Sequence, residues 1–113
     1  MADLVSIDEY NRLVAAQMSE DALQDQIEAL AFDLGWKTYH THDSRRSNPG
    51  WPDLALVHPT RGRFMVRELK KQTGRVSKEQ REWLDALTGA GVDAGVWRPI
   101  DYVTRAVERE LTA

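Results

Sequence analysis

Hydrophobic and polar positions alternate along the chain in two ways, one typical of helices and one typical of strands. Apolar residues recur every three or four positions between Ser19, a helix-capping residue type, and Gly35, which predicts a helix between them. A serine followed three residues later by Glu or Gln predicts a short helix over 7–16 and another that begins after Ser77. The spacing of apolar residues within 100–111 predicts a last helix.

Four extended segments lie between these helices. Residues 36–42 are rich in aromatic and β-branched types, which favours a strand. Residues 53–57 and 63–70 flank the turn residues of 59–62, so they form a predicted hairpin, and 92–97 is a fourth strand. The order predicts an α/β fold in which helices flank both sides of a mixed four-stranded sheet.

Length and composition exclude several classes of protein. The chain has 113 residues, 42% of them hydrophobic, which is the size and content of one packed domain. It has no cysteine, which excludes disulfides, iron–sulfur clusters, thiolate zinc sites and cysteine nucleophiles. No run of 18 apolar residues and no secretory signal pattern is present, so we expect a cytosolic protein without a membrane contact.

The charge is distributed unevenly along the chain. The net charge is −3, but residues 37–81 contain eleven basic and four acidic residues and have a net charge of +7. The segments on either side are acidic, with net charges of −7 over 1–36 and −3 over 82–113. A basic centre of this kind is compatible with binding a polyanion such as DNA and also with an ordinary solvated surface.

Three charged residues of the predicted hairpin are candidates for chemistry. Asp53 begins the first hairpin strand, and Glu68 and Lys70 lie near the end of the second. Side chains two positions apart on a strand share a face, and antiparallel pairing places Asp53 at the same end as Glu68. Two converging carboxylates repel unless a cation lies between them, and Mg²⁺ prefers such oxygen ligands. The Leu69 carbonyl can supply a further oxygen, and Lys70 can stabilise charge on a phosphate.

The motif Gly50-Trp51-Pro52-Asp53, followed by Glu68-Leu69-Lys70 and then Gln80, resembles the PD-(D/E)xK nuclease superfamily. Glu20 resembles the helical acidic residue of that superfamily. The sequence is most similar to the short, stand-alone form of the virus-type replication-repair nuclease (VRR-NUC) domain. The resemblance covers residues 19–98.

The resemblance implies a restriction-endonuclease-like core with the order αβββαβ and an extra helix at each end. It divides the chain into an N-terminal helical extension over 1–18, a nuclease core over 19–98 and a C-terminal helix over 99–113. It also implies a role for each motif residue. The implied ligands of Mg²⁺ or Mn²⁺ are Asp53, Glu68, the Leu69 carbonyl and Glu20, and the implied catalytic residues are Asp53, Glu68, Lys70, Gln80 and Glu20.

The family resemblance implies a metal-dependent endonuclease that hydrolyses DNA and selects branched DNA such as a Holliday junction. It implies a homodimer without an organic cofactor in a bacterial or phage-infected cell. Two alternatives stay open: a less selective flap, end or single-strand nuclease, and a DNA-binding module that does not cut. The N-terminal helix and residues 100–111 are candidates for the dimer interface, since symmetric cuts need two related sites.

Each motif residue also has a purely structural interpretation. Glu68 and Lys70 can form an exposed ion pair, Gln80 can simply complete a capping box, and Glu20 can stabilise a helix dipole. The histidines at 40, 42 and 58 can suggest zinc, but no cysteine supports that site. Trp51 can stack on a base, although ordinary packing is the commoner role for a tryptophan.

Candidate DNA contacts come from the basic centre. Arg and Ser side chains in the loop before Gly50 and basic residues after Lys70 are placed to contact phosphates. The expected nucleic-acid-binding residues are Arg45, Arg46, Ser47, His40, Lys71, Arg75 and Lys78.

Overall fold

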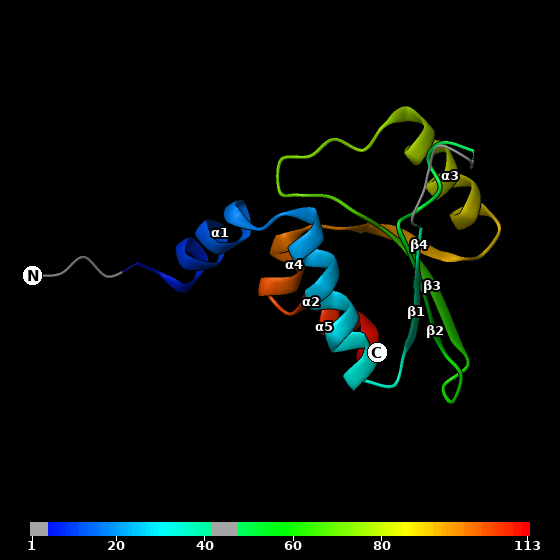
Figure 1. Ribbon diagram of the computed structural model, residues 1–113, viewed down its shortest axis with the longest axis horizontal. Helices are drawn as coiled ribbons and strands as arrows, with labels where there is room; N and C mark the ends of the chain where they lie inside the picture. Colours follow the sequence, from blue (N-terminus) through cyan, green and yellow to red (C-terminus); the bar gives the residue numbers. More distant parts are fainter. Residues whose placement is uncertain (1–4, 42–47) are drawn as a thin grey trace, which may run out of the picture.

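The computed structural model describes residues 5–41 and 48–113, which form five helices and four strands (Figure 1). In chain order the elements are α1 (Ile7–Gln17), α2 (Glu20–Asp33), β1 (Lys37–His40), β2 (Leu54–His58), β3 (Arg63–Leu69), α3 (Lys78–Gly89), β4 (Asp93–Trp97), α4 (Pro99–Val103) and α5 (Ala106–Thr112). None of the helices in these two segments has the length and apolar character needed to cross a membrane.

The strands form one mixed sheet in the order β1-β2-β3-β4. The first three strands are antiparallel neighbours, and β4 runs parallel to β3 because α3 connects the two. α2, α4 and α5 lie on one side of the sheet and α3 lies on the other (Figure 1). The α/β fold predicted from the sequence, with a mixed four-stranded sheet flanked by helices, is therefore confirmed.

The hydrophobic core lies between the sheet and the helix pair α2 and α5. Its members alternate along β2 and β3 with residues of the opposite face, as the period of two in a strand requires. The buried core residues are Leu23, Ile27, Ala31, Trp36, Leu54, Leu56, Met65, Leu69, Trp97, Val107 and Leu111. Since β3 lies between two other strands, five consecutive residues of it are buried, including the charged Arg67 and Glu68.

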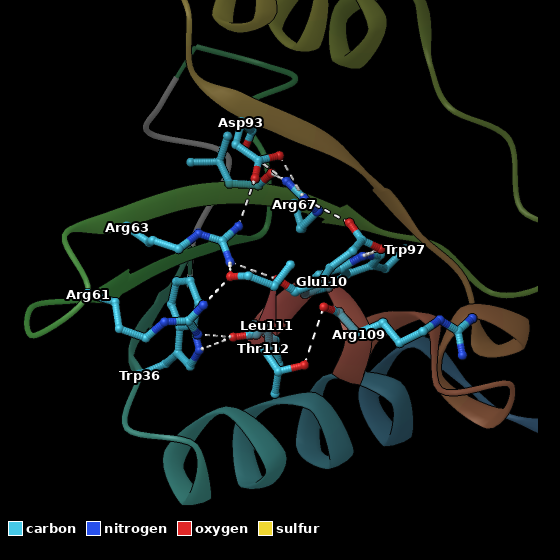
Figure 2. Close-up of polar contacts among 12 residues, drawn as sticks. Trp36, Arg61, Arg63, Arg67, Asp93, Trp97, Arg109, Glu110, Leu111 and Thr112 are labelled. Carbon is cyan, nitrogen blue, oxygen red and sulfur yellow. Dashed lines mark hydrogen bonds and ion pairs between the residues drawn. The ribbon is translucent and has the colours of Figure 1, made fainter.

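Arg67 projects from the core face of β3 into a polar network that connects β3, β4 and α5 (Figure 2). Its guanidinium donates to Asp93 Oδ1 at 2.9 Å and to Glu110 Oε1 at 2.9 Å. The other Glu110 oxygen accepts from Trp97 Nε1 at 3.0 Å, and the Trp97 ring lies 4.8 Å from the guanidinium carbon. Because each charged group has a partner, Arg67 can be buried at the centre of the sheet.

Serine caps begin three helices where the sequence predicts them. Ser6 accepts from the Glu9 amide, Ser19 from the Ala22 amide, and Ser77 forms a complete capping box with Gln80. The single helix expected over 100–111 is wrong: it is interrupted at Arg105, which has a positive φ of 66°. This interruption turns the chain, so that Val107 and Leu111 are buried on α2 and the sheet.

Candidate active site

Asp53 and Glu68 meet at the end of the sheet where β2 begins and β3 ends. The pairing of Leu54 with Arg67 places Asp53 beside Glu68, on the face of the sheet opposite the core. Oδ2 of Asp53 accepts a hydrogen bond from the Leu69 amide at 2.8 Å, which orients the Asp53 carboxylate toward the end of β3. The structure therefore brings together the two carboxylates that the sequence predicts to converge.

Glu68 is buried beside Lys70. Its side chain is only 2% exposed, and its Oε2 atom lies 3.2 Å from Lys70 Nζ. Burial and the neighbouring Asp53 carboxylate, opposed by Lys70, together raise the pKa of Glu68 from 4.5 to about 8. The interpretation of Glu68 and Lys70 as an exposed surface ion pair is wrong, because both side chains are withdrawn from solvent.

The oxygen atoms at this position fit a divalent cation. Oε1 of Glu68 is buried and has no hydrogen-bond partner in the described part of the chain. A buried acceptor of this kind is costly unless a ligand satisfies it, and Asp53 places a second carboxylate beside it. Within residues 5–41 and 48–113, no group of three or more His, Cys, Asp or Glu side chains is arranged as a metal site. Asp53 and Glu68 are the two carboxylates that the ends of β2 and β3 bring together here.

A polar cleft of about 360 Å³ contains all five residues that the sequence predicts to be catalytic. Asp53, Glu68 and Lys70 contribute from the adjoining ends of β2 and β3, Gln80 from α3 and Glu20 from α2. Glu20 is exposed in the first turn of α2, so a role for it as a metal ligand stays a prediction. Gln80 Oε1 accepts a hydrogen bond from the Ser77 amide at 2.8 Å, which confirms its capping role. Gln80 also lines the cleft, and its catalytic role stays a prediction.

Three further residues line the cleft that sequence reasoning missed: Asp21, Gln24 and Thr41. Gln24 follows Glu20 by one helical turn, so the spacing of four within α2 is a signal that could have indicated it. The sequence carries no signal for Thr41, because a tertiary contact places it in the cleft. Its backbone amide donates a hydrogen bond to the Asp53 carbonyl at 3.0 Å. That contact joins the segment after β1 to the segment before β2.

Three of the predicted DNA contacts follow the cleft residue Lys70 along the chain. Lys71 and Arg75 are exposed in the loop after β3, and Lys78 is the first residue of α3. His40 is the last residue of β1 and is half-buried. Arg45, Arg46 and Ser47 lie outside the described residues.

The loop after β3 is held in place by Arg98, another residue that sequence reasoning missed. Arg98 Nη1 donates to the carbonyl oxygens of Lys71 at 2.9 Å and Gly74 at 2.7 Å. The Gln72 side chain of the same loop accepts from the Ile100 amide at 3.0 Å. The basic loop is therefore fixed directly beyond Lys70.

Comparison with known proteins adds to this geometry. The sequence matches the VRR-NUC domain family over residues 3–99. The chain belongs to the VRR-NUC family. A solved structure of a VRR-NUC domain has a TM-score of 0.66 to this VRR-NUC chain at 22% identity, and the likeness covers 80% of this chain and 97% of that one. The restriction-endonuclease-like arrangement expected from the sequence is thus the fold of a VRR-NUC domain.

Two more proteins are similar to this VRR-NUC chain. The Fanconi-associated nuclease 1 homolog of Schizosaccharomyces pombe (strain 972 / ATCC 24843) is 38% identical over 56 residues, which is 50% of this chain and 8% of that protein. This chain therefore corresponds to a small part of that relative. The structure of Hjc, a Holliday junction resolvase from the archaeal hyperthermophile Archaeoglobus fulgidus, has a TM-score of 0.49 at 18% identity, with 66% of this chain and 62% of Hjc covered.

Proposed function

We propose that this VRR-NUC chain is a Mg²⁺- or Mn²⁺-dependent endonuclease that hydrolyses DNA phosphodiester bonds and prefers branched DNA. The observation that supports it most directly is the buried Glu68, whose Oε1 atom lacks a partner while Asp53 and Lys70 lie beside it. Membership of a nuclease family agrees with this chemistry. We expect the enzyme to act in the cytosol, with residues 19–98 as the nuclease unit.

Asp53, Glu68 and the Leu69 carbonyl are the groups that would hold the cation, with Glu20 nearby on α2. The ion, when bound, supplies a Lewis acid that polarises the phosphate and favours hydroxide as the nucleophile. The protein fixes these ligands through β-sheet pairing and through the hydrogen bond from the Leu69 amide to Asp53. Gln80 lines the cleft, where its amide can orient the attacking water or Lys70.

Lys70 supplies positive charge at the reacting phosphate. Its side chain lines the cleft and its Nζ atom is held by Glu68, so its position is set before DNA binds. From there it donates a hydrogen bond to the attacking water or to a phosphate oxygen as negative charge develops. Lys71, Arg75 and Lys78 extend this positive surface and contact neighbouring phosphates.

The function is tested with the purified chain and labelled four-way junction, flap and linear duplex DNA, each incubated with Mg²⁺, Mn²⁺ or EDTA. Paired, symmetric cuts in the junction that require a metal ion are expected. Equal cutting of all three substrates would favour the less selective nuclease, and binding without metal-dependent cutting would favour a DNA-binding module.

A homodimer would supply the two active sites needed for paired cuts. Of the two segments expected at the interface, α5 directs Val107 and Leu111 into the core of its own chain. α1 instead leaves Ile7, Tyr10 and Leu13 exposed, so α1 is the better candidate for the interface. Sedimentation of the full chain is expected to give a dimer, and a monomer that still makes paired cuts would contradict this proposal.

A further inference from the structure

Trp51 lies directly before the residues of the cleft and is held against α3. Gly50 has a φ of 96°, and a Cβ atom there would be 2.5 Å from the Glu79 carbonyl carbon, so only glycine permits this close approach. Pro52, on the other side of Trp51, is buried and fixes the backbone that leads to Asp53. The position of Trp51 relative to the proposed reacting phosphate is therefore set by both of its neighbours.

The Trp51 side chain rests on Trp83 but stays open to solvent. The two rings are T-shaped, with centroids 5.0 Å apart and an interplanar angle of 82°, and 38% of Trp51 is exposed. A shallow groove of about 370 Å³ is lined by Pro49, Glu79, Glu82, Trp83 and Ala86, and Trp51 adjoins it through its ring contact with Trp83. We call the rings of Trp51 and Trp83 the aromatic platform.

The charge of this groove indicates which part of a DNA strand it accepts. Glu79 and Glu82 line the groove, and their carboxylates repel a phosphate backbone. A nucleobase is uncharged, has an apolar face that stacks on indole, and carries N–H groups that can donate to carboxylates. Glu79 and Gln80 are consecutive on α3, and Gln80 lines the catalytic cleft, so a base on the platform would be adjacent to the reacting phosphate.

We propose that the aromatic platform stacks an unpaired nucleobase of the substrate next to the phosphodiester that is cut. This inference rests on the proposed nuclease function and adds a residue that determines its specificity. Bases inside a continuous duplex are already stacked on both faces and paired, whereas a branch point or single strand presents a base that can leave the stack. The platform thereby favours branched DNA over linear duplex.

The test compares Trp51→Ala and Trp51→Phe with the wild type on a flap or junction and on linear duplex. The ratio of kcat/KM for branched to linear DNA is expected to fall about tenfold in Trp51→Ala and much less in Trp51→Phe, which retains a ring that can stack. Phe64→Ala is the matched control, because Phe64 is an exposed aromatic residue of β3 that lines no part of the cleft or groove. An unchanged ratio in Trp51→Ala would overturn the proposal.

A second readout does not depend on cleavage. A 2-aminopurine base at the branch is expected to lose fluorescence when it stacks on the platform of the wild type in EDTA, and to lose less in Trp51→Ala. The variant Ala86→Glu tests the same groove if Trp51→Ala is poorly folded. It adds a third carboxylate to the groove wall and leaves Trp51 in place. It is expected to weaken the preference for branched DNA. Fluorescence that stays equally quenched in both variants would overturn the platform. A wild type that quenches the probe but cuts no DNA with either metal would instead refute the nuclease function alone.

Discussion

The Nζ atom of Lys70 lies 3.2 Å from Oε2 of Glu68, and the two side chains project from the same face at the end of β3. Only 2% of the Glu68 side chain and 15% of the Lys70 side chain are exposed. Placing charge this far from solvent is costly, so the contact is weak evidence for a stabilising role.

Replacing Lys70 by Ala is expected to lower the rate of DNA cleavage by about 100-fold or more, because the positive charge opposite the developing phosphate charge is lost. DNA binding should be largely retained, since the exposed basic residues after β3 are unchanged. Single-turnover cleavage and a binding titration in EDTA measure the two effects. The matched control is Lys37→Ala, at an exposed position of β1. Undiminished cleavage by Lys70→Ala would remove Lys70 from the mechanism.

The stability of the metal-free protein is expected to fall as the pH rises from about 4.5 to 8. Glu68 has a pKa of about 8 in the folded chain and an ordinary value of 4.5, so the folded state binds more protons across this interval. Unfolding stability therefore decreases with pH, by at most about 1.4 kcal/mol per pH unit from this group.

Replacement of Glu68 by Gln should remove that slope, because the amide stays neutral at every pH in the interval. Urea unfolding in EDTA at pH 5, 6, 7 and 8 measures it, and Asp25→Asn, an exposed residue of α2, is the control. Identical slopes for the wild type and Glu68→Gln would show that Glu68 is already ionised at pH 5.

Loss of Arg67 is expected to destabilise the fold. The Arg67→Met variant would lose the charge-assisted hydrogen bonds to Asp93 and Glu110, whose carboxylates are nearly half exposed, at a cost of about 2 kcal/mol in the free energy of unfolding. Urea unfolding at pH 7 measures the change. The control is Arg81→Met, at an exposed position of α3, which is expected to change the free energy of unfolding by less than about 0.5 kcal/mol. An Arg67→Met variant as stable as this control would contradict the prediction.

Replacing Arg98 by Ala is expected to weaken DNA binding without impairing the chemical step. The carbonyls of Lys71 and Gly74 lose their shared donor, so the loop that carries Lys71 and Arg75 must be ordered when DNA binds. We expect KM to rise by about tenfold, which is the effect of losing one or two net hydrogen bonds, while kcat stays near the wild-type value.

Arg105→Ala is the control for that experiment, because the Arg105 side chain is 81% exposed and far along the chain from the loop. A variant Arg98→Ala with unchanged KM and reduced kcat would show that Arg98 acts on the catalytic cleft and not on the loop.

The elements whose signals are local were predicted well. The caps at Ser6, Ser19 and Ser77 act within three residues, so the sequence indicates them directly. The hairpin and its period of two likewise place Asp53 and Glu68 at one end of the sheet. The last helix was predicted without its interruption at Arg105, because no glycine or proline marks a turn whose conformation depends on packing against α2.

The sequence by itself determined the order of the elements, the mixed sheet and the convergence of Asp53, Glu68 and Lys70, since these depend on spacing within a strand, a turn or a helix end. Only the tertiary structure decided that Glu68 is buried with one unpartnered oxygen, that Arg98 holds the basic loop and that Glu110 of α5 binds Arg67. Burial and these contacts join segments far apart in the chain, and their energies exist only after the core has assembled.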